Sequence, residues 1–276
     1  MSIKYAYLGP AGTFTEAALQ KISTPSDKLI AYANVTAALD AVRNGECEKA
    51  LVPIENSVEG VVARTLDELA IGEPLVITAE TTLPVSFSLM TLHNTNAAEI
   101  KSIATHPHAE SQCRSFIAKN YPNAQVIESA STAAAAKGLS KGDYDAAIAG
   151  SNASKNYDLK VIAENIGDNT GAITRFVLVE KPGNQPKAIG KDRTSLAVFI
   201  ALDHAGALLE ILNEFAKHQV NLTFIQSRPT GSQLGHYHFI IDAEGHIEDK
   251  PISAALVGLK EICEDVRFLG SYPQAK

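Results

Sequence analysis

The chain has 276 residues, of which 45% are hydrophobic and 20% charged, a composition that excludes a disordered or fibrous protein. Its formal net charge of −7 offers no broad positive surface for nucleic acid or for an anionic membrane. No apolar run approaches the roughly 18 residues that span a bilayer, so we expect neither nucleic acid nor membrane as a partner.

The first 180 residues alternate short β-branched runs with alanine-rich runs, which is typical of a parallel or mixed sheet covered by helices. Strands are predicted at residues 4–8, 29–32, 50–54, 74–80, 86–91, 102–105, 146–149, 159–166 and 175–180. Helices are predicted to begin near Thr15, Thr36, Val62, Ala109, Thr132 and Asn152.

Residues 181–186 read as a linker, because two prolines and a glycine interrupt the pattern there. We therefore place a domain boundary at residues 182–192. Beyond it the order of predicted elements is βαββαβ, which is the ferredoxin-like arrangement. Its strands are predicted at 195–202, 222–227, 236–241 and 266–269, and its helices at 206–218 and 252–263.

The three cysteines, Cys47, Cys113 and Cys263, form no CxxC pair and no disulfide framework. Such usage is typical of a reducing compartment. The first residues carry one lysine and no apolar core of signal-peptide length. These features predict a cytoplasmic location.

Four polar loops rich in small residues each follow a predicted strand and lead into a helix. They are residues 9–15 (GPAGTFT), 53–60 (PIENSVEG), 105–113 (THPHAESQC) and 128–134 (ESASTAA). Helix N-termini present free backbone N–H groups and a positive dipole end, so converging loops could hold a small polycarboxylate. The alternative is that these Ser, Thr and Asn residues only cap their helices.

Residues 168–180 place Thr174 beside Arg175 at the start of an apolar strand. A polar pair at a strand edge can also be simply solvated. The pairs His106/His108 and His236/His238 lack Cys, Asp or Glu at a familiar ligand spacing, so no metal site is expected.

These segments, in this order, resemble the prephenate dehydratase family. The resemblance is carried by YLGPAGTFTEAA, LVPIENSVEGVV, THPHAESQC, STAAAA and TRF, and by GALLEIL and NLTFIQSRP in the part that resembles an ACT domain. It implies a two-lobed α/β catalytic domain, like type II periplasmic binding proteins, followed by a ferredoxin-like ACT domain. The expected boundaries are 1–181 for the catalytic domain (lobe one 1–76 and 158–181, lobe two 77–157), 182–192 for the linker and 193–276 for the ACT domain.

The resemblance implies a monofunctional lyase that converts prephenate to phenylpyruvate, water and carbon dioxide in L-phenylalanine biosynthesis. L-Phenylalanine is then the expected allosteric inhibitor at the ACT domain, with no metal or organic cofactor, and the chain is expected to form a homodimer or homotetramer. Two alternatives stay open from the sequence: an arogenate dehydratase, and a non-catalytic cytoplasmic sensor of small molecules.

The resemblance also assigns roles to residues. Thr174 is the expected proton donor, Arg175 is expected to attract a substrate carboxylate, and Phe176 to pack beneath the substrate. The expected substrate-binding residues are Thr13, Asn56, Ser57, Gln112, Ser131 and Thr132. The expected phenylalanine-binding residues are Gly206, Ala207, Leu208, Leu209, Asn221, Leu222, Gln226, Ser227, Arg228 and Pro229.

Three positions depart from the family's usual pattern. Ala172 stands two positions before Thr174, where Asn is common, and His108 replaces a common Gln. Gln226 replaces the Glu of the usual ESRP motif, a change expected to alter coupling between effector and catalytic sites more than effector binding.

Overall fold

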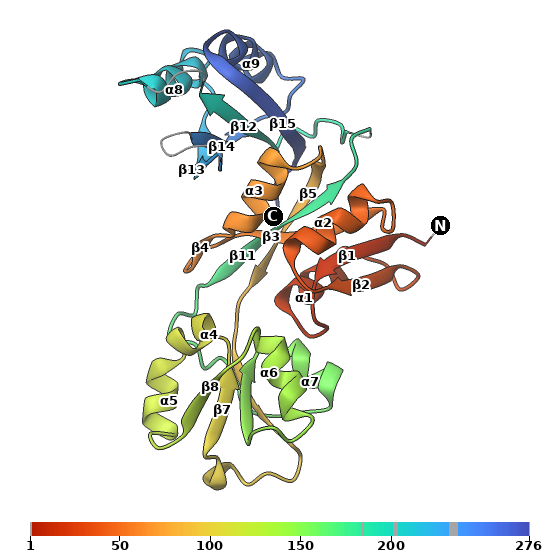
Figure 1. Cartoon of the computed structure of the whole chain (residues 1–276), viewed down its shortest axis with the longest axis vertical. Coiled ribbons are helices and arrows are strands. Elements are labelled where there is room, and N and C mark those ends of the chain that lie inside the picture. The colour runs from red at the N-terminus through yellow and green to blue at the C-terminus, as the bar shows by residue number, and fades with distance from the viewer. Residues whose placement is uncertain (1, 184, 201–203, 232–236, 276) are drawn as a thin grey trace.

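The computed structural model describes residues 2–183, 185–200, 204–231 and 237–275. These residues form three sheets covered by helices, which confirms the predicted α/β class. Figure 1 shows them as three bodies along the long axis, with the first lobe between the second lobe and the C-terminal domain. None of the described helices is both long and apolar enough to cross a membrane.

The first lobe is a mixed sheet in the order β2-β1-β3-β11-β5, with β4 paired to β3. Its strands are β1 (Lys4–Leu8), β2 (Lys28–Tyr32), β3 (Lys49–Asn56), β4 (Gly60–Val61), β5 (Val76–Pro84) and β11 (Ile173–Glu180). Its helices are α1 (Phe14–Gln20), α2 (Val35–Arg43) and α3 (Ala63–Ile71). The side chain of Asn34 caps α2 by accepting from the Ala37 N–H at 2.8 Å.

The second lobe is a five-stranded sheet in the order β10-β6-β9-β7-β8. Its strands are β6 (Ser88–Thr91), β7 (Ser102–Thr105), β8 (Gln125–Glu128), β9 (Ala146–Ala149) and β10 (Lys160–Ala163). Its helices are η1 (Ala97–Glu99), α4 (Pro107–Ser111), α5 (Arg114–Asn120), α6 (Thr132–Leu139) and α7 (Asn152–Tyr157). The sequence analysis did not predict β8, whose four residues follow an exposed stretch.

The chain crosses between the lobes twice, as expected, but both crossings lie later in the sequence than the expected boundaries. β5 pairs along its length with β11 and so belongs to the first lobe, although residues 77–84 were assigned to the second. β10 pairs with β6 and belongs to the second lobe, although residues 158–163 were assigned to the first. Strand partners decide both memberships, and a single sequence does not reveal partners.

The polar loops meet because of how the strands run. β1 is parallel to β2 and β3, so their carboxyl ends lie at one edge, and the antiparallel β11 begins at that edge. In the second lobe β7 is parallel to β8 and β9, so the loops into α4, α6 and α7 share an edge. Figure 1 shows α4, α6 and α7 on the side of the second lobe that faces the first lobe.

The C-terminal domain has the predicted βαββαβ order and an antiparallel sheet in the order β13-β14-β12-β15. Its elements are β12 (Asp192–Ile200), α8 (Ala207–Lys217), β13 (Leu222–Pro229), β14 (Tyr237–Glu244), α9 (Lys250–Ile262) and β15 (Cys263–Pro273). Ala201, Leu202 and His236, which belong to predicted strands, lie outside the described residues.

The two faces of the C-terminal sheet pack against different partners. One face buries Phe239 and Ile241 beneath α8 and α9. The other contributes Ile240 and Tyr272 to the hydrophobic core of the first lobe. At Gly270 a side chain would collide with the Ile77 carbonyl, so only glycine lets β15 approach β5 this closely. The C-terminal domain is thus docked directly on the first lobe.

Candidate active site

Thr174 and Asn56 form the centre of the polar edge of the first lobe. They lie opposite each other where β11 begins and β3 ends. Asn56 Nδ2 donates to Thr174 Oγ1 at 2.8 Å, and Asn56 Oδ1 accepts from the N–H groups of Val58 and Glu59, both at 2.9 Å. Those two backbone donors fix the orientation of the amide. The hydroxyl of Thr174 is therefore an acceptor here, and its proton has no acceptor among the described residues.

Ser57 holds the start of β11 to the turn after β3. Its hydroxyl accepts from the Ile173 N–H at 3.0 Å, and its own N–H donates to the Ile173 carbonyl at 2.9 Å. Two residues after this pair of hydrogen bonds, the β3–β11 register shifts between Arg175 and Phe176. Such bulges redirect side chains next to functional sites. Ser57 and the bulge together set the direction of the Thr174 side chain.

Phe176 lies two residues along the strand from Thr174 and on the same face of the sheet. It is almost fully buried among Tyr5, Tyr7 and Leu51. It therefore forms the apolar floor beneath the polar edge.

Arg175 does not lie as expected. Alternation along the strand puts its side chain on the opposite face from Thr174. There its guanidinium lies 2.7 Å from Asp242 of the C-terminal domain and 3.4 Å from Glu80. The expectation that Arg175 attracts a substrate carboxylate is wrong for this structure, because buried carboxylates of the protein already neutralise it.

The second lobe contacts the polar edge through α4. Gln112 Nε2 donates to Glu59 Oε1 at 2.7 Å, and His108 Nδ1 lies 3.4 Å from the other oxygen of Glu59. Gln112 is buried, whereas His108 is exposed. The predicted Gln112 is thus brought to the turn that carries Asn56, and Glu59 is a partner that the sequence analysis did not single out.

Helix α7 makes a further contact between the lobes, at the loop before α1 and at α1 itself. Asn152 Nδ2 donates to the Thr13 carbonyl at 2.9 Å, and Asn156 Nδ2 donates to Glu16 Oε2 at 2.7 Å. Tyr157 donates to the Ala11 carbonyl at 2.7 Å. The sequence analysis did not single out Asn152, Asn156 or Tyr157 as site residues, although the amide-rich stretch SNASKN after a predicted strand was a visible signal.

Thr13, Ser131 and Thr132 stand at helix N-termini. The hydroxyl of Thr13 accepts from the Glu16 N–H and donates to the Leu8 carbonyl, so it caps α1. Ser131 caps α6 by accepting from the Ala134 N–H at 3.0 Å. Thr132 is half-buried, and its hydroxyl makes no hydrogen bond with any described residue. Of the three hydroxyls, that of Thr132 is thus the one left for a ligand.

Metal and thiol chemistry have no visible site in the described ranges. No group of three His, Cys, Asp or Glu side chains there could hold a metal ion. Cys113, in the THPHAESQC segment, is fully buried, and burial raises the pKa of its thiol to about 12. A thiol in that state is a poor nucleophile at neutral pH.

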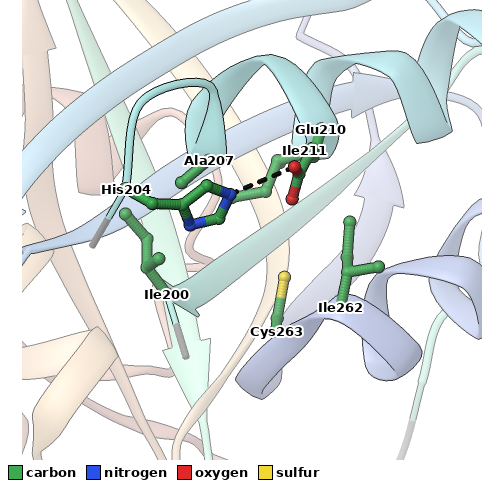
Figure 2. A pocket seen from close by; sticks show the side chains of 7 residues that line it. All are labelled: Ile200, His204, Ala207, Glu210, Ile211, Ile262 and Cys263. Atoms are coloured by element: carbon green, nitrogen blue, oxygen red, sulfur yellow. Dashed lines mark hydrogen bonds and ion pairs between the residues drawn. The ribbon is translucent and has the colours of Figure 1, made fainter. Parts of the chain in front are cut away.

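The expected effector segments lie on two parts of the C-terminal domain. A cavity of about 140 Å³ opens beside the start of α8 and is lined by Ile200, His204, Ala207, Glu210, Ile211, Ile262 and Cys263. Figure 2 shows His204 across this cavity with its ring bonded to Glu210, at 3.1 Å. Of the expected phenylalanine-binding residues, only Ala207 lines it. Leu208 and Leu209 are exposed beside it.

The other expected effector segment lies on β13. Asn221, Ser227 and Pro229 are exposed, while Leu222 and Gln226 are half-buried. Arg228 makes two hydrogen bonds of 2.9 Å with Asp67 on α3, which ties the segment to the first lobe. No hydrogen bond between described residues joins residues 206–209 to residues 221–229.

Comparisons with known proteins agree with this architecture. The prephenate dehydratase family model matches residues 5–184, and the ACT domain model matches residues 194–261. A prephenate dehydratase from Amycolatopsis methanolica is 45% identical over 273 residues, which cover 99% of this chain and 89% of that protein.

Two solved structures extend the comparison. Prephenate dehydratase from Arthrobacter aurescens, in complex with L-Phe, superposes with a TM-score of 0.92 at 47% identity, covering 98% of this chain and 90% of that one. GqqA, described as a novel type of quorum quenching acylase, superposes with a TM-score of 0.87 at 26% identity, covering 98% of both chains. On the family models and the identity to curated relatives, the chain belongs to the prephenate dehydratase family of enzymes and carries a C-terminal ACT domain.

Proposed function

We propose that this chain converts prephenate to phenylpyruvate, water and carbon dioxide in L-phenylalanine biosynthesis. The observation that carries the proposal is the hydrogen bond from Asn56 to Thr174, which leaves the Thr174 proton available at the edge where both lobes meet. We propose Thr174 as the group that protonates the leaving hydroxyl.

The reaction needs one proton donor and a substrate that is held in the correct orientation. The bond between the ring and its carboxylate breaks, its electron pair enters the ring, and the ring hydroxyl departs with the proton as water. A positioned proton donor contributes about 10²–10⁴-fold in rate. The Asn56 N–H would stabilise the Thr174 oxygen as its proton is transferred, and Phe176 supplies an apolar floor for the ring that becomes aromatic.

Substrate carboxylates would be held by neutral donors rather than by Arg175. The candidates are the side chains of Gln112 and Thr132 and the free N–H groups at the start of α6, with Thr13, Ser57 and Ser131 shaping the surrounding turns. Asn56 orients Thr174 from beneath. Neutral donors can bind a substrate carboxylate through charge-assisted hydrogen bonds without a cationic side chain.

Regulation by L-phenylalanine at the ACT domain is part of the proposal. It is supported by the Arthrobacter aurescens relative, which was solved in complex with L-Phe. We propose that Gly206–Leu209 of one copy and residues 221–229 of a neighbouring copy form this site, in a cytoplasmic homodimer or homotetramer. The separation of the two segments within one chain favours such an arrangement.

One assay tests the activity against its alternatives. Purified protein is supplied with prephenate or arogenate, each with and without L-phenylalanine, in chelator-treated buffer. We expect phenylpyruvate from prephenate, with turnover suppressed by L-phenylalanine. Faster turnover of arogenate would make the chain an arogenate dehydratase, and binding without turnover would make it a sensor.

A further inference from the structure

Arg175 joins the strand that carries Thr174 to the C-terminal domain. Its Nη1 lies 2.7 Å from Asp242 Oδ2 and 3.4 Å from Glu80 Oε2, and its guanidinium lies 5.6 Å from the ring centre of Phe224. Nε and Nη2 are buried without a hydrogen bond of their own. Asp242 is therefore the one carboxylate at close hydrogen-bond distance from this guanidinium among the described residues.

Asp242 is itself fixed from several directions. Its Oδ1 accepts from Ser195 at 2.6 Å, and the Ser195 oxygen lies 2.7 Å from the hydroxyl of the fully buried Tyr272. A second guanidinium, that of Arg193, lies 3.6 Å from Asp242 Oδ2 and 3.2 Å from Glu80. Asp242 thus has a rigid position set by three strands of the C-terminal sheet.

Charge in this cluster is balanced inside the protein. Two guanidiniums, Arg175 and Arg193, face two buried carboxylates, Glu80 and Asp242, while Glu55 lies 3.5 Å away and is partly exposed. Removing one carboxylate leaves a buried positive charge without its partner. This is strongly destabilising, so the surrounding structure would shift to reduce the cost of the unpaired charge. Arg175 belongs to β11, so relief of that charge would act on the start of this strand.

That movement would reach Thr174 directly. Arg175 is the next residue along β11, and the β3–β11 register shifts immediately after it. β11 stays in regular register with β5 over these residues, so the irregularity lies on the β3 side, where Thr174 faces Asn56 and where the Arg175 anchor would act. The hydroxyl and the anchor lie on opposite faces of one strand, one peptide apart.

The same anchor touches an expected effector segment. Phe224, whose ring faces the Arg175 guanidinium, lies on β13 and pairs with Asp242, and the β13–β14 register shifts between Leu222 and Phe224. A displacement of β13 would therefore change the environment of both Arg175 and Asp242. These contacts link residues 221–229 to the strand that carries Thr174.

We propose that Asp242 is a positioning residue for the reaction: through Arg175 it holds β11 so that Thr174 keeps its hydrogen bond with Asn56, and effector binding on β13 acts on the same ion pair. This inference rests on the proposed function and assigns its regulation to a named contact. In this proposal neither Asp242 nor Arg175 contacts the substrate.

The test compares Asp242→Asn with wild type for phenylpyruvate formation from prephenate. The amide keeps the size and the Ser195 contact but lacks the charge. We expect kcat to fall about tenfold to hundredfold, since small misplacements of reacting groups cost that much, with KM within about twofold. L-Phenylalanine should still bind, measured by calorimetry, but should inhibit the variant several-fold less. Asp242→Glu should recover part of kcat.

Asp67→Asn is the matched control, because it removes a different ion pair between the domains, with Arg228, without touching Arg175. We expect its uninhibited kcat to stay near wild type. If Asp242→Asn does not fold, Phe224→Leu removes the ring beside the guanidinium and should lower kcat in the same direction. If the folded Asp242→Asn variant keeps wild-type kcat and normal inhibition, the inference is overturned and the proposed function is not affected. Phe224→Leu serves for the same test if Asp242→Asn does not fold. An inactive wild type overturns the proposed function and the inference with it.

Discussion

The hydroxyl of Thr174 receives a hydrogen bond from Asn56, and the direction of that bond determines what the hydroxyl can do next. An oxygen that accepts from an amide keeps its own proton for another partner. We predict that Thr174→Val, which preserves shape and removes the proton, lowers kcat on prephenate by about 10²–10⁴-fold. KM should change little, because the proton is needed in the transition state. Steady-state kinetics on prephenate measure both values.

Two variants control for that result. Thr174→Ser keeps the hydroxyl and should retain most activity. Asn56→Asp keeps the turn contacts to Val58 and Glu59 but turns the donor into an acceptor, so Thr174 would donate to it instead. It should lose activity with Thr174 intact. Near-normal turnover by Thr174→Val would remove Thr174 from the mechanism.

For single residues, the sequence could identify site candidates but not which face of the strand each side chain occupies. The resemblance supplied Thr174, Asn56 and Gln112, and the structure brings Asn56 and Gln112 into hydrogen bonds at the polar edge. It misplaced Arg175, because a motif records which residues occur and not which face they occupy. The two-residue period of a strand separates Arg175 from Thr174, and its actual partner, Asp242, is distant in sequence.

The start of helix α6 carries two neighbouring hydroxyls, one that caps the helix and one that could bind a ligand. Ser131 is engaged with the Ala134 N–H, whereas the neighbouring Thr132 makes no hydrogen bond with described residues. We predict that Ser131→Ala lowers the free energy of unfolding by about 1 kcal/mol, the usual value of a cap, and leaves KM for prephenate unchanged. Thermal or urea unfolding and kinetics measure the two effects.

Thr132→Val is the paired variant on the same turn. It should raise KM for prephenate several-fold while changing stability little, because it removes a hydroxyl available to a carboxylate and no cap. If both variants changed only stability, the start of α6 would be a structural feature and the carboxylate would be bound elsewhere.

Elements were predictable where local pattern decides them and not where partners do. The helix that begins near Thr36 and the βαββαβ order follow from the local residue pattern, and both appear in the structure. The lobe membership of β5 and β10 depends on pairing across the sheet, with β11 and with β6. The sheet to which a strand belongs cannot be deduced from the strand's own residues.

Docking of the C-terminal domain on the first lobe buries His238, which stacks on Phe199 and whose two ring nitrogens have no hydrogen-bond partner in the described structure. Burial lowers the pKa of His238 from its usual value of 6.5, and the nearby guanidiniums of Arg228 and Arg267 lower it further, against Asp67. The unfolded chain then takes up a proton that the folded chain resists. Stability should therefore fall as pH drops below about 6.5.

Calorimetric melting between pH 5 and pH 8 measures this dependence. His238→Leu should flatten the acid limb, since the variant carries no proton at this position in either state. His93→Leu is the control, because His93 is largely exposed and its removal should leave the acid limb unchanged. An acid limb that persists in His238→Leu would assign the sensitivity to other groups.

The free edge of the C-terminal sheet bears on how whole molecules associate. β13 pairs only with β14 among the described strands, and it exposes 43% of Ile225. An open strand edge can extend by pairing with a second copy about a twofold axis. Such pairing would join two sheets and bring the two QSRP segments together. We predict a dimer or tetramer by light scattering at micromolar concentration.

Ile225→Lys tests that edge. Because twofold pairing brings the substituted positions of both copies to one seam, each dimer would gain two like charges there, and we expect monomers. Turnover of prephenate without effector should persist, since Ile225 contacts neither lobe's polar edge, while inhibition by L-phenylalanine should be lost. Val257→Lys places the same change on α9, at a side chain 62% exposed, and should leave the assembly intact. A monomeric wild type, or an Ile225→Lys variant that still dimerises, would show that β13 is not the seam and that the effector site is completed within one chain or by another face.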